Sequence, residues 1–296
     1  MKIFVVGAGR LGRALIAFFA QGGHEIVGAS NRTAAGAAAA RERTGVDAVV
    51  SSSPVLPAAV DMVWITVPDR NIASVAAAMH AQSPIPPSTV LVHAAGALPA
   101  AVLRNAVPSA GGVAAAHPLQ TFADSRRGPQ MAREAVWFLE GDAEAQSRVR
   151  ELLHGCGART RPLPTKDRAL YHAAAVLASN ALVALASAAT RALGPVGLGR
   201  EEALAALLPL MSAAVRNLAA EGLPRALTGP IARGDAAVVA AHVRALAAVV
   251  PDVREAYTVL AKETVRLARE LGEASAEELD AVSAALTSIP ARIQAP

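Results

Sequence analysis

A glycine-rich turn near the N-terminus constrains the fold of this chain more than any other stretch. The apolar run 2–6 is followed at once by glycines in the spacing GxGxxG, and 13–20 then has apolar residues at helical intervals. In this order Gly7 makes the tight turn, Gly9 lets the backbone approach a pyrophosphate, and Gly12 lets the helix pack on the strand. Since the helix start adds free N–H groups and a positive dipole end, we expect a bound dinucleotide; a glycine-rich turn without a ligand is the alternative. The residues expected at its pyrophosphate are Gly7, Ala8, Gly9, Arg10, Leu11 and Gly12.

The end of the second predicted strand, 25–30, indicates which dinucleotide is bound. Proteins that prefer NAD usually have Asp or Glu about twenty residues after the glycines, where the carboxylate holds the ribose 2′-hydroxyl. This chain has no acidic residue there and offers a guanidinium among small hydrogen-bonding groups, which suits a 2′-phosphate. We therefore expect NADP(H), with a solvated loop arginine as the alternative. The residues expected at the ribose are Ser30, Asn31, Arg32 and Thr33.

Apolar strands alternate with helical patterns through the first half of the chain. Further strands are expected at 48–50, 61–67, 89–93, 112–116, 135–139 and 159–163. This alternation predicts a doubly wound, mostly parallel sheet, and ligands on such sheets bind beyond the carboxyl ends of the strands. Val67, Pro68 and His93 stand at such ends and are expected at the cofactor, and His117 stands at another.

From residue 164 onward the sequence shows only helical patterns. Helices are expected at 165–193, 200–221, 235–249, 253–271 and 276–287. Thr165 and Asp235 are favourable N-caps, and Gly194 and Gly272 are favourable C-terminal stops. The sequence thus predicts an α/β fold with an NADP-binding Rossmann domain over 1–163, followed by an all-α substrate and dimerisation domain over 164–296.

Composition excludes several classes of protein. The net charge is +4, but the arginines are scattered and aromatic residues are only 3%, so we expect no nucleic-acid surface and an aliphatic core. Cys156 is the only cysteine, which excludes an intramolecular disulfide and a cysteine-based metal site; we expect no metal. The uncharged run 173–190 is about long enough to span a bilayer, yet its alanines and interspersed polar residues favour a buried helix. Because the first strand begins at residue 2, no signal peptide is expected, and a cytoplasmic protein is indicated.

Three segments carry a resemblance to known proteins: His117–Phe122 (HPLQTF), Tyr171–Asn180 (YHAAAVLASN) and Leu227–Asp235 (LTGPIARGD). With the domain order, they resemble the Rossmann-like proteins whose helical half is domain of unknown function 2520. That group is related to ketopantoate reductase, pyrroline-5-carboxylate reductase, prephenate dehydrogenase and 6-phosphogluconate dehydrogenase. The resemblance implies an NADP-dependent oxidoreductase.

The same resemblance implies where catalytic residues lie. Hydroxyacid and ketopantoate enzymes carry Lys-x-x-x-Asn on the long helix, with lysine as general acid; Asn180 matches the asparagine, and Val176 stands where the lysine is expected. Valine cannot transfer a proton, so another group must supply it. His172 lies one turn before Val176, and histidine is a common acid–base residue. His117 resembles a histidine that contacts the substrate hydroxyl in prephenate dehydrogenases. Lys166 is a further candidate at the mouth of the site. For each of these side chains a structural or surface role is the alternative.

A segment of the helical half resembles the substrate loop of pyrroline-5-carboxylate reductases. Those enzymes hold the substrate carboxylate with a Ser-Pro-Gly-Gly segment in a similar place. Thr228, Gly229 and Arg233 are expected to do the same here, with Arg233 pairing with the carboxylate in a bidentate manner. The alternative is a structural loop whose arginine pairs with Glu221 or Asp235.

These observations predict an NADPH-dependent reductase of a small keto- or imino-carboxylate, which acts in a cleft between the two domains. A histidine is expected to supply the proton, and Asn180 to orient the carbonyl or imine. The alternative is an NADP-binding sensor or interaction protein that has kept the fold without turnover. The alanine-rich long helix also predicts a homodimer, because small residues permit close packing against a second copy.

Overall fold

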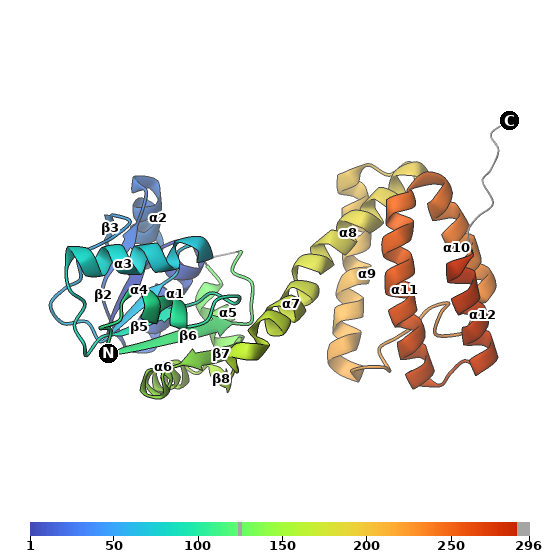
Figure 1. Ribbon diagram of the computed structural model, residues 1–296. Coiled ribbons are helices and arrows are strands. Elements are labelled where there is room, and N and C mark those ends of the chain that lie inside the picture. Colours follow the sequence, from blue (N-terminus) through green and yellow to red (C-terminus); the bar gives the residue numbers. More distant parts are fainter. Residues whose placement is uncertain (124–125, 289–296) are drawn as a thin grey trace. The chain divides into compact units, whose positions relative to one another are not determined.

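The computed structural model describes residues 1–123 and 126–288. They divide into two compact units, of which the first is Met1–Ser179 and the second begins at Asn180 (Figure 1). The domain boundary expected after residue 163 remains a prediction; the helix that follows it belongs to the first compact unit.

The first unit is built on one eight-stranded sheet with the order β3-β2-β1-β4-β5-β6-β7-β8. All neighbouring pairs are parallel except β6 and β7. The strands are β1 (Lys2–Val6), β2 (Glu25–Asn31), β3 (Ala48–Val50), β4 (Met62–Ile65), β5 (Val90–His93), β6 (Gly112–Pro118), β7 (Val136–Gly141) and β8 (Arg159–Pro162). The predicted mostly parallel α/β fold is therefore confirmed.

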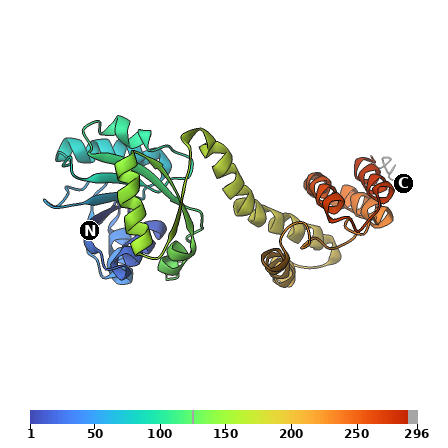
Figure 2. The ribbon, with the colours of Figure 1, turned by 90° about the horizontal axis from the view of Figure 1, so that it is seen from below.

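Helices cover both faces of this sheet, and Figure 2 shows α3 on one side and α1 on the other. Alternate residues of β1 enter different cores: Ile3 packs with α1, whereas Phe4 packs with α3. A strand buried on both faces reads as a continuous apolar run, which explains the sequence of 2–6. The helices and helical turns of the unit are α1 (Arg10–Gln21), α2 (Ala34–Thr44), η1 (Asp69–Asn71), α3 (Ile72–Gln82), α4 (Ala101–Ala106), α5 (Gly128–Glu134), α6 (Ala143–Gly155), η2 (Thr165–Asp167) and α7 (Arg168–Ala178).

The core under α1 is not purely aliphatic, which corrects the expectation from composition. Trp64 and Trp137 are fully buried and meet edge to face, with ring centroids 5.8 Å apart. Phe19 lies 5.0 Å from Trp64, and Phe18 stacks on Trp137 at 6.4 Å. The few aromatic residues are concentrated at one place, where each buries a large area.

The second unit contains only helices among its described residues. They are α8 (Asn180–Leu193), η3 (Gly194–Val196), α9 (Arg200–Glu221), α10 (Ala236–Val249), α11 (Pro251–Leu271) and α12 (Ala276–Thr287). Asp235 caps α10 by accepting from Val238 N at 3.1 Å, and Gly272 ends α11 in a left-handed conformation. These two caps and the all-α class agree with the prediction, whereas Thr165 lies inside η2 and does not cap α7.

The prediction of one continuous helix over 165–193 is wrong, because the helix is interrupted at Ser179. Ser179 has φ −122° and ψ −72°, so α7 ends before it and α8 begins at Asn180. Serine and asparagine side chains compete with the backbone for hydrogen bonds, which disfavours a helix interior. His172 and Asn180 therefore do not share one continuous helical face.

Two helical stretches, Thr165–Val196 and Arg200–Glu221, are long and apolar enough to cross a membrane by length and composition alone. Only 6% of the most apolar window of each is buried. The expectation that 173–190 is a buried helix is therefore not met, because most of this apolar stretch is exposed among the described residues.

Candidate functional site

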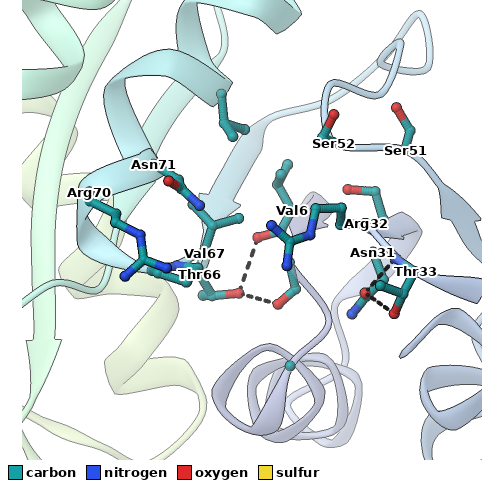
Figure 3. A pocket seen from close by; sticks show the side chains of 15 residues that line it. Val6, Asn31, Arg32, Thr33, Ser51, Ser52, Thr66, Val67, Arg70 and Asn71 are labelled. Atoms are coloured by element: carbon teal, nitrogen blue, oxygen red, sulfur yellow. Dashed lines mark hydrogen bonds between the residues drawn. The ribbon is translucent and has the colours of Figure 1, made fainter. Parts of the chain in front are cut away.

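A cavity of about 280 Å³ lies beyond the carboxyl ends of β1, β2 and β4 (Figure 3). Its walls are the glycine turn, the end of β2, the loop after β3 and the turn after β4. The lining residues are Val6, Gly7, Gly9, Ser30, Asn31, Arg32, Thr33, Ser51, Ser52, Thr66, Val67, Pro68, Arg70, Asn71 and Val75. Most of the residues predicted to bind the cofactor therefore meet around one pocket.

The glycine turn has the geometry that its sequence predicts. Gly7 has φ +93°, and a Cβ there would lie 2.8 Å from Val67 Cγ1. A Cβ on Gly12 would lie 2.3 Å from the carbonyl oxygen of Gly7, which no side chain tolerates. At Gly9, by contrast, the nearest atom to such a Cβ is 3.9 Å away. Gly7 and Gly12 thus permit the close turn, and the space beside Gly9 is open to a ligand.

Hydrogen bonds fix this turn to the two neighbouring strands. The amides of Gly7 and Ala8 donate to the carbonyl oxygen of Ser30 at 2.9 and 2.8 Å. Thr66 Oγ1 donates to the carbonyl oxygen of Gly7 at 2.8 Å. The first turn of α1, from Arg10, has no side-chain cap, so its amides are free to bind an anion.

The four residues at the end of β2 differ in whether other described residues bind their side chains. Asn31 Oδ1 accepts from the amide of Thr33 at 3.1 Å, and Thr33 Oγ1 caps α2 by accepting from Gly36 N at 3.1 Å. Ser30 is fully buried. Arg32 is exposed and forms no ion pair within residues 1–123 and 126–288. Of the four residues predicted at the ribose, Arg32 is the one that offers a cation.

A histidine cluster lies at another strand end of the same unit. His117, on β6, and Tyr171, on α7, share a hydrogen bond of 2.6 Å between Nδ1 and the phenol oxygen. The rings of His117 and His172 are 6.2 Å apart. A Cβ on Gly96 would lie 2.6 Å from His172 Nδ1 and 2.9 Å from His117 Nε2, so both rings approach the same point. His172 Nδ1 is buried without a hydrogen-bond partner among the described residues.

Burial sets the charge state of this cluster. Desolvation, followed by the nearby His172 and Arg168, lowers the pKa of His117 to about 4. Burial also raises the pKa of Tyr171 to about 12. His117 is therefore a neutral ring and Tyr171 a neutral phenol near pH 7. His117 can donate or relay a hydrogen bond there, but it is not an imidazolium acid.

One face of β7 fixes α7 in place through two contacts. Glu140 Oε2 accepts from Arg168 at 3.2 Å, and Phe138 packs on Tyr171 with ring centroids 4.6 Å apart. Arg168 is 3% exposed and also donates to the carbonyl oxygen of Gly96 at 3.2 Å. The buried ion pair thus links β7, α7 and the loop after β5.

Two further predicted residues have surroundings that limit what they can do. Both ring nitrogens of His93 are used within its own loop, at 3.2 Å to the amide of Ala95 and 3.1 Å to the carbonyl oxygen of Pro99, and the ring is fully buried. Its ring therefore has no nitrogen left for a cofactor. Lys166 lies exposed in η2.

The remaining predicted site residues belong to the second unit. Asn180 begins α8, and Thr228 and Arg233 are exposed in the loop before α10. Gly229 has φ +102°, and its carbonyl oxygen accepts from the amide of Arg233 at 3.3 Å. Within the described part of the chain the Arg233 side chain has no ion pair, so the alternative in which it pairs with an acidic neighbour is not observed.

Sequence reasoning missed several residues that the structure brings to these places. Arg70 and Asn71 line the pocket from the turn after β4, and Ser51 and Ser52 line it from the loop after β3. Tyr171 was part of a recognised segment but had no assigned role. A signal existed for Arg70, because it lies two residues after Pro68, at the same strand end as Val67; no sequence signal pointed to the two serines.

Comparison with known proteins agrees with this geometry. Residues 2–95 match the family described as NADP oxidoreductase coenzyme F420-dependent, and residues 135–264 match the domain of unknown function 2520. None of the curated proteins compared with the chain matches it.

Among solved structures, the chain is similar to a candidate NADP oxidoreductase from Bacteroides fragilis, with 23% identity over 89% of this chain and 97% of the other and a TM-score of 0.72. A protein from Thermotoga maritima has 28% identity over 92% and 98% of the two chains, with a TM-score of 0.68. Pyrroline carboxylate reductase from Plasmodium falciparum, solved with NADP bound, has 15% identity over 96% and 98%, with a TM-score of 0.59. These likenesses concern the fold, and the two family matches cover different parts of the chain: residues 2–95 are similar to the NADP oxidoreductase coenzyme F420-dependent family, and residues 135–264, which include β7 and β8, are similar to the domain of unknown function 2520.

Proposed function

We propose that this protein is an NADP(H)-dependent oxidoreductase that reduces a small keto- or imino-carboxylate. The observation that carries the proposal is the pocket at the glycine turn, where the uncapped start of α1 and the unpaired Arg32 face one cavity. These residues fit a dinucleotide with a 2′-phosphate, because an anion-binding helix start and a guanidinium stand where the pyrophosphate and ribose are expected. When bound, the reduced nicotinamide supplies a hydride.

The histidine cluster is the proposed place for the protein's own part in the reaction. If Tyr171 donates its hydroxyl proton to Nδ1, then His117 carries its proton on Nε2, the nitrogen that faces Gly96 and His172. A neutral imidazole in this state donates a hydrogen bond to a carbonyl oxygen or imine nitrogen and polarises it. His172 is the proposed proton source, since its buried Nδ1 has no other partner among the described residues.

The second unit is proposed to contribute substrate-binding groups. Arg233 and Thr228 are exposed, and an unpaired guanidinium binds a carboxylate in a bidentate manner. Asn180 is proposed to orient the reacting group. Substitution of Arg233 by Lys should raise KM for a carboxylate substrate more than it lowers kcat, because lysine keeps the charge but loses the bidentate geometry.

The test is oxidation of NADPH in the presence of 2-oxo acids, cyclic imines and semialdehydes, followed by the absorbance of the reduced nicotinamide, with NADH in parallel. Turnover with one class, and preference for NADPH, is the expected result. Failure of NADPH to bind, measured as no rise in melting temperature with ligand concentration, would overturn the proposal.

One observation favours a second candidate, an NADP-binding sensor or interaction protein. Val176 stands at the position expected for the catalytic lysine, and the break at Ser179 separates it from Asn180. A sensor should bind NADPH without turnover of any substrate. Separate His117→Gln and His172→Gln substitutions discriminate, because in a reductase each lowers the rate while NADPH affinity stays unchanged.

We also propose a homodimer and a cytoplasmic location. The exposed apolar side chains of α8 and α9, among them Val183, Leu208 and Leu210, support a second copy of the chain as the partner. The free, buried Cys156 is compatible with a reducing compartment. A monomer by light scattering at micromolar concentration would rule out the dimer.

A further inference from the structure

Two arginines, Arg32 and Arg70, line the pocket at the glycine turn. Arg32 follows β2, whereas Arg70 lies in η1 after β4, so they stand on opposite walls. Figure 3 shows the two guanidinium groups extending toward one another from these walls. Both residues are exposed, and neither forms an ion pair within the described part of the chain.

This arrangement lacks the negative charge that would normally accompany it. Among the described residues that line the pocket there is no Asp or Glu. The acidic neighbour Asp69 is exposed and does not pair with Arg70. Like charges directed at one another repel, and the repulsion is relieved when an anion lies between them. The pocket is therefore suited to a group that carries two negative charges at this point.

We propose that Arg70 is a second recognition residue for the adenosine 2′-phosphate, so that Arg32 and Arg70 hold that phosphate from both sides. The proposal rests on the proposed function, because it presupposes NADP(H) in this pocket. The pyrophosphate belongs at the glycine turn and the start of α1, whereas the ribose lies beside the end of β2. A phosphate on that ribose faces Arg32 and, across the cavity, Arg70. Ser51 and Ser52 line the same cavity and add small neutral side chains to its wall.

A different role for Arg70 would change the affinities for NADPH and NADH in a different way. A guanidinium can stack on the adenine ring instead of binding the phosphate. Adenine is common to NADPH and NADH, whereas the 2′-phosphate is present only in NADPH. The phosphate role therefore predicts a loss of affinity confined to NADPH.

The experiment is a direct binding titration of the full chain with NADPH and NADH, followed by nicotinamide fluorescence and repeated with 2′,5′-ADP and 5′-AMP by calorimetry. Arg70→Gln should weaken NADPH and 2′,5′-ADP by about 10- to 100-fold, as for the loss of a charged hydrogen bond, and leave NADH and 5′-AMP within about 2-fold. Arg70→Lys should recover part of the loss, because it restores the charge without the bidentate fork. Arg43→Gln, which removes the same charge from an exposed position of α2 outside the pocket, is the matched control and should change nothing.

Two measurements sharpen the assignment. The losses in Arg32→Gln and Arg70→Gln should not add in the double variant, since both side chains bind one phosphate. Raising the salt concentration should weaken NADPH binding less in Arg70→Gln than in the wild type. An equal loss for NADPH and NADH in Arg70→Gln, or no loss for NADPH, would overturn the proposal.

Failure of this proposal and failure of the proposed function are distinguishable in the same titration. If the wild type binds NADPH and Arg70→Gln binds it equally well, only the role of Arg70 is overturned. If the wild type binds neither dinucleotide, the proposed function itself is overturned, and this inference with it. Because binding is measured without a substrate, the result does not depend on turnover.

Discussion

The dinucleotide pocket and the histidine cluster lie in the same unit but hold their polar groups in opposite ways. The cations of the pocket, Arg32 and Arg70, are exposed and unpaired among the described residues. The polar groups of the cluster are half-buried and contact one another, and the buried Arg168 is paired with Glu140 at 3.2 Å. An exposed cation costs the fold little and is available to a ligand, whereas a buried network stabilises the fold and fixes geometry. The difference indicates that the pocket is built for binding and the cluster for positioning.

The largest expected effect is on the buried ion pair of the cluster. Glu140→Gln leaves the Arg168 guanidinium buried without a counter-charge, and the free energy of unfolding should fall by about 3–5 kcal/mol. Tryptophan fluorescence during urea denaturation reports on this unit, because Trp64 and Trp137, the two tryptophans of the chain, both lie in it. Glu151→Gln, at an exposed position of α6, is the control. A loss below about 1 kcal/mol would mean that the cluster tolerates change as an exposed ion pair does.

The second-largest expected effect is a pH dependence of the free energy of unfolding, to which the histidine cluster contributes and the pocket does not. Burial lowers the pKa of His117 from 6.5 to about 4, so below pH 6.5 the unfolded chain binds a proton that the folded chain does not. Stability is therefore lost as the pH falls from about 6.5 toward about 4, by about 3 kcal/mol from this group. Denaturation of the wild type and of His117→Gln across this range should show the difference. If the free energies of unfolding of the wild type and of His117→Gln changed in parallel over this pH range, this role of His117 would be contradicted.

The third test fills the space between the two histidine rings. Gly96→Ala places a methyl group 2.6 Å from His172 Nδ1 and 2.9 Å from His117 Nε2, which must displace one ring. We expect a loss of about 1–3 kcal/mol, as for overpacking, together with shifted imidazole signals in NMR spectra. Gly155→Ala is the matched control: the added Cβ in helix α6 meets no atom within 4 Å and should be neutral or stabilising. Unchanged imidazole signals in Gly96→Ala would show that the rings do not converge there.

The smallest effect is expected in the pocket. Arg32→Gln and Arg70→Gln should each change the free energy of unfolding by no more than about 0.5 kcal/mol, because neither side chain is buried or paired among the described residues. The same urea denaturation measures it. A loss of more than about 1 kcal/mol would show that these arginines support the fold, and the contrast with the cluster would disappear.

The sequence predicted the Rossmann sheet and the pocket well because their determinants are local. Gly7, Gly9 and Gly12 are adjacent to the strand and helix that they join, and the end of β2 follows by chain order. Arg70 escaped prediction because its place opposite Arg32 depends on β4 lying beside β1. A strand order of that kind is a property of the folded sheet.

The histidine cluster was harder to predict because its partners are far apart in sequence. Tyr171 and His117 are 54 residues apart, and their contact depends on α7 lying against β7. The break at Ser179 was also missed, because the apolar periodicity continues through it. The concentration of aromatic side chains around Trp64 was missed for another reason: composition counts residues but does not locate them.

Strands β7 and β8 run opposite to the other six strands, and β7 has a consequence for how this protein can change during evolution. Trp137 points into the core beneath the sheet, while its neighbour Phe138, paired in register with His117, faces Tyr171. Successive residues of a strand face opposite sides, so an insertion or deletion of one residue within β7 would exchange these two rings. The core would lose Trp137 in the same event in which the histidine cluster lost the contact of Phe138 with Tyr171. Variation in length is therefore expected in the loops that flank β7 and not within the strand itself.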